Sequence, residues 1–108
     1  YPNLPSNKYY QLACKYLPKG SCGVISFGIK GGRQAAEEFM GHLTLASIET
    51  HVADSRTCCL HPASSTHRQM NDEQLKAAGV SPDLIRLSVG LENINDLIGD
   101  VKSALDRI

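Results

Sequence analysis

The chain has 108 residues, no formal net charge at pH 7, and 42% hydrophobic and 20% charged residues, which is typical of a globular domain with one core. The balanced charge excludes the basic footprint of proteins that bind nucleic acids or anionic membranes. No apolar run approaches the roughly 20 residues that a membrane-spanning helix needs, and the first residues do not resemble a signal peptide.

The first part of the chain predicts two helices separated by a strand. Apolar side chains recur at helical spacing over residues 7–17, which predicts the first helix. Residues 22–29 alternate between bulky and small side chains, as a strand does. A second helix is expected over residues 33–43. The preceding pair Gly31-Gly32 lacks the spacing of a phosphate-binding loop, so we interpret it as a turn.

The middle of the chain predicts short extended segments and a loop. We expect strands near residues 44–48 and 56–60. The following segment, 61–67, is rich in small hydroxylated side chains, so we predict a loop outside the core. Asn71 and Gln74 form a capping-box signal at the start of a short helix.

The end of the chain predicts a strand over residues 84–90 and a helix over residues 93–107. The apolar side chains of this helix are spaced for packing against a sheet, whereas Asp96 and Asp100 are expected on its solvated face. The chain therefore predicts an α+β fold, with a mostly antiparallel sheet of about four strands and helices on one face.

The strand over residues 84–90 contains one arginine. Alternation places Ile85 and Leu87 on one face and Arg86 with Ser88 on the other. A guanidinium group keeps its charge at every biological pH, and its planar fork of donors fits a carboxylate. From the strand alone two interpretations stay open. Arg86 either pairs with an acid of the chain or faces solvent, which is the commoner case, or it binds a carboxylate ligand.

The cysteines and histidines form no recognisable metal site or catalytic motif. Cys58 and Cys59 are adjacent in a strand and point to opposite faces, and no C-x-x-C pair is present. We therefore expect no bound metal, and reduced thiols in a cytoplasmic protein. Neither a nucleophile elbow nor an H-E-x-x-H motif occurs, and no lysine has a context that implies a Schiff base. The residues alone reveal no reaction.

Five motifs lie in one order along the chain: YLPKG at 16–20, GVISF at 23–27, IKGGR at 29–33, HPASSTHRQ at 61–69 and LIRLSVGLE at 84–92. Together they closely resemble the C-terminal part of the Cys/Met-metabolism family of pyridoxal-phosphate enzymes, and within it the O-acetylhomoserine sulfhydrylases. The resemblance covers essentially all of residues 1–108.

The resemblance implies that residues 1–108 are the small C-terminal domain of a longer enzyme with the fold-type I aminotransferase architecture. Its partner would be the N-terminal domain, which holds pyridoxal 5′-phosphate on a lysine that this chain does not include. The complete enzyme, a homotetramer, would exchange the γ-acetoxy group of O-acetylhomoserine for sulfide or a thiol and release homocysteine or methionine and acetate. Residues 1–108 alone are expected to be inactive.

The resemblance also implies three substrate-binding residues. The family's arginine in the L-I-R-L-S-V-G segment pairs with the α-carboxylate of the amino-acid substrate, and Arg86 occupies that position. Thr66 matches a threonine beside this site. His51 stands where relatives have Ser or Asn, and residues 51–54, His-Val-Ala-Asp, depart from the family's small polar residue, apolar residue, Gly and Asp. No catalytic, cofactor-binding or metal-binding residue is implied in this chain.

Two alternatives stay open. Methionine γ-lyase and cystathionine γ-synthase share the same scaffold, so the resemblance also fits either activity. The chain can also be a stand-alone module that binds or dimerises without catalysis.

Overall fold

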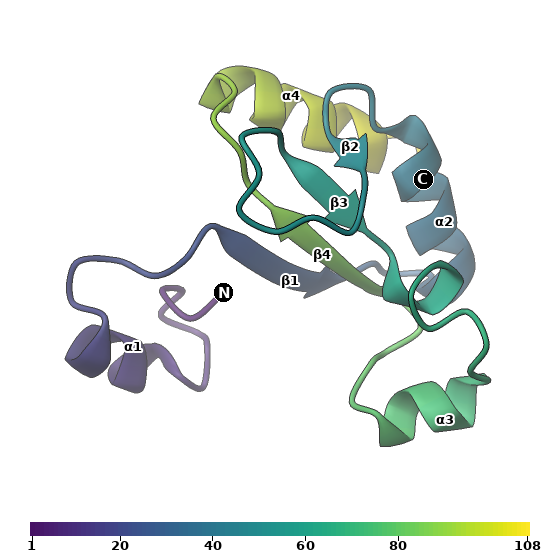
Figure 1. The fold of residues 1–108 in the computed structure, drawn as a ribbon, viewed down its shortest axis with the longest axis horizontal. Coiled ribbons are helices and arrows are strands. Elements are labelled where there is room, and N and C mark those ends of the chain that lie inside the picture. Colours follow the sequence, from purple (N-terminus) through teal and green to yellow (C-terminus); the bar gives the residue numbers. More distant parts are fainter.

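A four-stranded sheet forms the centre of the computed structural model, which describes residues 1–108 (Figure 1). The strand order is β1-β4-β3-β2, and the strands are β1 (Val24–Gly28), β2 (Ser47–Ile48), β3 (Cys58–Leu60) and β4 (Leu84–Ser88). β4 runs antiparallel to both β1 and β3, while β2 and β3 form one parallel pair at the edge. The predicted mostly antiparallel sheet of four strands is confirmed.

Two of the four helices cover one face of this sheet. The hydrophobic core joins residues of α2 (Gly32–His42) and α4 (Ile94–Leu105) to the sheet, and Phe39 and Ile85 are fully buried in it. Burying such a side chain contributes about 1.5–3 kcal/mol. The shorter helices α1 (Tyr10–Tyr16) and α3 (Asp72–Ala77) lie beyond opposite ends of the sheet (Figure 1). The predicted helical layer therefore consists of α2 and α4.

The capping box predicted at the start of α3 is present, and a glycine follows the end of the helix. The Asn71 side chain accepts a hydrogen bond from the backbone N–H of Gln74, and the Gln74 side chain accepts one from the N–H of Asn71, which makes a complete capping box. Gly79 follows the helix with a φ of 75°. This left-handed conformation favours glycine and ends the helix.

The other face of the sheet is partly covered by residues 49–57, which connect β2 to β3 and are called here the crossover loop. The backbone N–H of Ala53 donates to the Ser88 hydroxyl at 3.2 Å. At the end of the loop, the N–H and hydroxyl of Thr57 donate to the Glu92 carboxylate at 2.7 and 2.8 Å. The crossover loop therefore covers part of the sheet face that carries Arg86.

Asp100 is buried, contrary to the expectation that it lies on the solvated face of its helix. Only 8% of Asp100 is exposed. Its carboxylate accepts hydrogen bonds from the N–H groups of residues 44, 45 and 46 at 2.8, 3.0 and 3.0 Å and from the Thr44 hydroxyl at 2.7 Å. The helical pattern placed Asp100 correctly on α4 but did not show that the segment before β2 turns its N–H groups toward it.

The loop predicted over residues 61–67 contributes to the core, which corrects that expectation. His61 and Ala63 are each 2% exposed, and Pro62–Ser64 form a short 3-10 helix, η1. Nε2 of His61 donates to the Pro82 carbonyl oxygen at 2.7 Å, and Nδ1 lies 2.8 Å from the Ser64 hydroxyl. Because both ring nitrogens have partners, the imidazole is tolerated in the interior.

Candidate functional site

Arg86 lies in the middle of β4, between Ser26 of β1 and Leu60 of β3. No acidic side chain of the chain forms an ion pair with it. Its one hydrogen bond runs from Nη2 to the Thr50 carbonyl oxygen at 2.7 Å. Nε is buried and has no hydrogen-bond partner. A buried donor without a partner costs about 1–3 kcal/mol, and more when it is charged, so Arg86 keeps donor capacity that no group of the chain uses.

Arg86 donates a hydrogen bond to the backbone carbonyl group that directly precedes His51. The carbonyl group that accepts from Arg86 belongs to the Thr50–His51 peptide bond. The His51 side chain itself is largely exposed, and its Nδ1 lies 2.8 Å from the Glu49 carboxylate. The structure therefore places two of the three expected site residues next to each other, without a direct hydrogen bond between them.

A cluster of charges holds this part of the crossover loop. Arg56 donates to both carboxylate oxygens of Glu49, at 2.9 and 3.1 Å, and to Asp54, with Nε and Nη2 each 3.3 Å from an oxygen. The side-chain and backbone hydrogen bonds from Arg56 lower the pKa of Asp54 to about 2. Asp54 is therefore ionised at neutral pH, and Arg56 ties both ends of the segment that contains His51.

Thr66 is less closely connected to the site. It lies in the exposed turn after η1, and its hydroxyl is 2.9 Å from Nδ1 of His67. No hydrogen bond joins it to Arg86 or His51. β3 ends at Leu60, the partner of Arg86, and the chain continues through η1 to Thr66, so Thr66 follows the end of β3 that lies beside Arg86.

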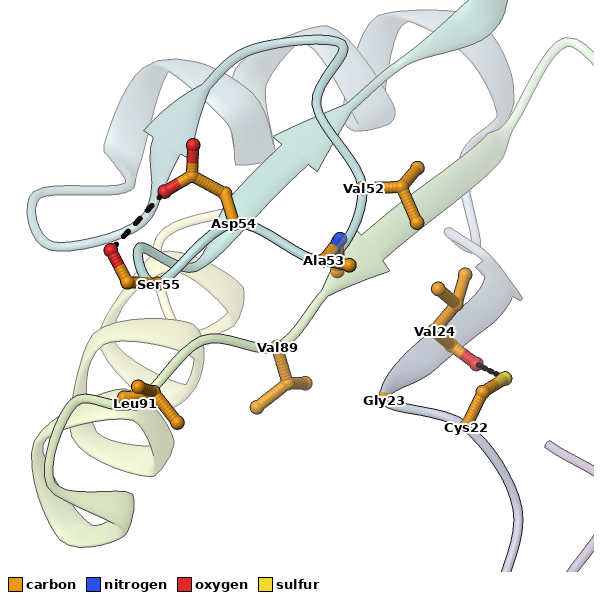
Figure 2. A pocket seen from close by; sticks show the side chains of 10 residues that line it. Cys22, Gly23, Val24, Val52, Ala53, Asp54, Ser55, Val89 and Leu91 are labelled. Carbon is orange, nitrogen blue, oxygen red and sulfur yellow. Dashed lines mark hydrogen bonds between the residues drawn. The ribbon is translucent and has the colours of Figure 1, made fainter.

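A groove of about 530 Å³ opens beside the site on the same face of the sheet. Figure 2 shows Val52 and Ala53 of the crossover loop on one side and Cys22 and Val24 at the start of β1 on the other. None of the three expected site residues lines this groove, which reaches the strand at Ser88. The sequence did not predict it, because periodicity does not indicate where the crossover loop runs.

The lysines of this chain lie on its surface. All six lysines are exposed, and none lines the groove of Figure 2: Lys8, Lys15, Lys19, Lys30, Lys76 and Lys102. No group of three or more His, Cys, Asp or Glu side chains is arranged to hold a metal ion. No helix is long and apolar enough to cross a membrane.

Comparison with known proteins gives consistent matches. A model of the family described as "Cys/Met metabolism PLP-dependent enzyme" matches residues 1–106. The chain is similar to O-acetyl-L-homoserine sulfhydrylase 1 of Thermus thermophilus, with 46% identity over 97% of this chain and 25% of that protein. It is also similar to homocysteine synthase of Schizosaccharomyces pombe (44% identity, 98% of this chain, 25% of that protein) and to L-methionine gamma-lyase of Porphyromonas gingivalis (41%, 100%, 27%).

The chain spans about a quarter of the length of the curated relatives it matches. Among solved structures it resembles a chain from Campylobacter jejuni that is assigned as an O-acetylhomoserine (thiol)-lyase. The TM-score is 0.87 and the identity 40%, over 98% of this chain and 25% of that one. That structure contains N′-pyridoxyl-lysine-5′-monophosphate. The likeness confirms the predicted α+β fold.

Proposed function

This chain belongs to the family of Cys/Met metabolism PLP-dependent enzymes, and we propose that it supplies the part of the active site that binds the substrate's α-carboxylate. The resemblance that the five motifs predicted is thereby confirmed at the level of the family. In this proposal residues 1–108 are the small C-terminal domain of a longer enzyme. In the same proposal, the pyridoxal phosphate on which the family depends is held by the rest of that enzyme, since this chain spans about a quarter of its relatives.

The observation that carries the proposal is the state of Arg86. Its guanidinium has no acidic partner, makes one hydrogen bond to a neutral carbonyl, and keeps a buried Nε without an acceptor. A carboxylate supplies two acceptors in the plane of the fork and balances the charge. Holding that carboxylate fixes the position of the substrate's Cα, and such positioning contributes to catalysis by reducing the entropy lost in the reaction.

We assign His51 and Thr66 supporting roles in substrate binding. His51 is covalently adjacent to the carbonyl that anchors Arg86, which favours a contact with the same carboxylate. Thr66 offers a hydroxyl on the segment that follows the end of β3 beside Arg86. Both side chains are exposed in this structure, so a substrate and the rest of the enzyme can reach them.

For the complete enzyme we propose O-acetylhomoserine sulfhydrylase activity, in which sulfide or a thiol replaces the γ-acetoxy group. The names of the Thermus thermophilus and Leptospira meyeri relatives support this substrate. We further propose that the enzyme is a homotetramer in the cytoplasm, where its thiols stay reduced. Methionine γ-lyase activity is the second candidate, because enzymes of that name are also about 40% identical to this chain.

Kinetics of the complete enzyme test the proposal. Arg86→Lys keeps the charge and loses the fork, so the KM for O-acetyl-L-homoserine should rise about 10- to 100-fold, the equivalent of one or two charge-assisted hydrogen bonds. Arg107→Lys, at an exposed arginine far along the chain, is the matched control. An unchanged KM in Arg86→Lys would remove Arg86 from the substrate site.

Substrate choice and the role of the domain have their own tests. The complete enzyme should turn over O-acetyl-L-homoserine with sulfide faster than it cleaves methionine, and the opposite order would favour the lyase. Residues 1–108 alone should show no turnover and no Schiff-base absorption band with pyridoxal phosphate. A coding region for these residues alone would favour the stand-alone binding module.

A further inference from the structure

We infer that the apolar groove between α4 and β1, called here the α4 groove, binds a helix from the part of the same enzyme chain that lies outside residues 1–108. The inference rests on the proposal that these residues are one domain of a longer enzyme, and it names a surface that joins this domain to the rest. The α4 groove is lined by Leu87 and lies on the sheet face that α2 and α4 cover, whereas the neighbouring Arg86 belongs to the other face.

The α4 groove is apolar and long. It has a volume of about 400 Å³, and its main lining residues are Ile25, Leu87, Val89, Ile98, Val101 and Leu105. A second hollow of about 390 Å³ shares Leu105 and continues along β1, past Phe27 to Ile29. Together they follow α4, whose 12 residues extend over about 18 Å. The surface therefore has the length of an ordinary helix.

The apolar side of α4 is wider than the core of this chain uses. Leu97 and Ala104 are buried. Ile94 and Ile98, one helical turn apart, are 61% and 59% exposed, and Leu105 is 42% exposed. Single exposed aliphatic side chains are common on protein surfaces, whereas a contiguous apolar patch is typical of an interaction site. These side chains therefore indicate a contact that residues 1–108 do not make among themselves.

The shape and charge of the α4 groove fit a helix. Neither α2 nor α4 passes behind β1, the edge strand of the sheet (Figure 1). A further helix beside α4, at the usual separation of about 8–10 Å, would direct an apolar stripe into the groove. An added strand would instead pair with the free edge of β1 and leave the groove empty. The two charged lining residues, Lys102 and Asp106, pair with each other, so the groove favours an apolar occupant.

The length of the related proteins assigns the occupant to the same enzyme. This chain spans only a quarter of the sulfhydrylase and of the solved chain that it matches, so about three quarters of such an enzyme is available to cover the groove. A second copy fits less well, because a twofold contact would place one hollow against another. The helix α1 also carries exposed apolar side chains, but its seven residues extend over only about 10 Å.

Thiol labelling of the complete enzyme tests whether the α4 groove is covered. Ile98→Cys introduces a thiol into the groove, and Ser103→Cys introduces one on the opposite, exposed side of α4 as the matched control. Each enzyme is treated with iodoacetamide under native conditions, and the modified peptide is quantified by mass spectrometry. The thiol at position 98 should react at least about 10-fold more slowly than the thiol at position 103, because a packed helix excludes the reagent. Equal rates would overturn the inference.

Photo-crosslinking identifies the occupant. A diazirine-bearing aliphatic amino acid replaces Ile98 in the complete enzyme, and the irradiated product is separated on a denaturing gel and mapped by mass spectrometry. The product should keep the mass of one chain and join residue 98 to a helix outside residues 1–108. A product with the mass of two chains would assign the groove to a second copy and overturn the inference. A product confined to residues 1–108, or no product, would overturn it as well.

The outcomes distinguish this inference from the proposed function, because Arg86 and the α4 groove belong to opposite faces of the sheet. If Arg86→Lys leaves the KM unchanged while the thiol at position 98 is protected, the substrate-binding role fails and the docking surface stands. If Arg86→Lys raises the KM while the thiols at positions 98 and 103 react equally fast, only the docking surface fails.

Discussion

The carboxylate of Asp100 on α4 accepts hydrogen bonds from both the backbone N–H and the hydroxyl of Thr44, at 2.8 and 2.7 Å. Together with the N–H groups of residues 45 and 46, this ties the second covering helix to the segment that enters β2. The contact lies inside the molecule and joins parts of the chain that are far apart in sequence. It therefore fixes the segment just before β2, from which the chain continues into the crossover loop.

Asp100→Ala should destabilise the protein by about 2–4 kcal/mol, because it leaves one buried and two partly buried N–H groups and the Thr44 hydroxyl without their acceptor. Urea unfolding measured by circular dichroism gives this value. Asp96→Ala, on the exposed side of the same helix, should change the free energy of unfolding by no more than about 0.5 kcal/mol. Equal effects of the two variants would contradict the structural role of Asp100.

The stability of the protein should fall in acid partly because of Asp100. Burial tends to raise the pKa of its carboxyl group, but the hydrogen bonds from Ala46 and Thr44 outweigh burial and lower it. A carboxylate whose pKa is lower in the folded state contributes stability above its unfolded pKa, near 3.9, and loses it as the pH falls through the folded value. Unfolding free energies measured between about pH 6 and pH 2 should show a shallower decline in Asp100→Asn than in wild type.

Ala53→Gly should stabilise the chain by about 1 kcal/mol. Ala53 has a φ of 59°, the one non-glycine residue in the left-handed region, and a side chain there costs about 1–2 kcal/mol. Glycine also gains freedom in the unfolded chain, which reduces the benefit. Ala77→Gly, in α3, is the control of opposite sign, with an expected loss of about 1 kcal/mol. Thermal unfolding of both variants tests the prediction.

Gly90→Ala should displace the crossover loop. A Cβ at Gly90 would lie against the backbone of Ser55 and Arg56, closer than carbon and oxygen atoms approach in proteins. Backbone atoms, unlike the end of a side chain, cannot rotate out of the way. We therefore expect the free energy of unfolding to fall by about 2 kcal/mol or more. Gly99→Ala, where a Cβ meets open space in α4, should instead stabilise by about 0.5–1 kcal/mol. Denaturant midpoints of the two variants should move in opposite directions.

The thiols should fall into two classes. Cys14 and Cys22 are exposed, whereas Cys58 and Cys59 are buried, and burial raises the pKa of Cys59 to about 12. A buried, protonated thiol is a poor nucleophile. A colorimetric disulfide reagent should therefore titrate two thiols rapidly in the native protein and the other two only after denaturation. Rapid reaction of all four would show that the sheet opens readily.

Sequence patterns predicted the order of the elements and the faces of β4 because both follow from local periodicity. Ile85 and Arg86 alternate in burial as the strand pattern requires, and the capping box of α3 is a short-range signal. The burial of Asp100 and His61 was not predictable in this way. Each depends on hydrogen bonds to residues distant in the chain, such as Pro82 for His61, and no local pattern encodes such a partner.

The candidate site was predictable to a similar extent. Alternation placed Arg86 on the face away from the helices, and the family resemblance supplied its expected role together with those of Thr66 and His51. The partners of Arg86 and His51 depend on the path of the crossover loop, which brings Thr50 over the strand and Glu49 beside the imidazole. That path is set by tertiary contacts, so the Glu49–His51 pair became visible only in three dimensions.

The pairing of β1 with β4 joins the beginning of the chain to its end. Such a contact closes a long stretch of flexible polypeptide before it gains any stabilisation, which slows folding relative to helical proteins of the same size. Arg86 obtains its neighbour Ser26 of β1 only through this closure. The surroundings of Arg86 should therefore form late in folding, and recovery of the affinity proposed for this site during refolding would report completion of the native topology rather than early collapse.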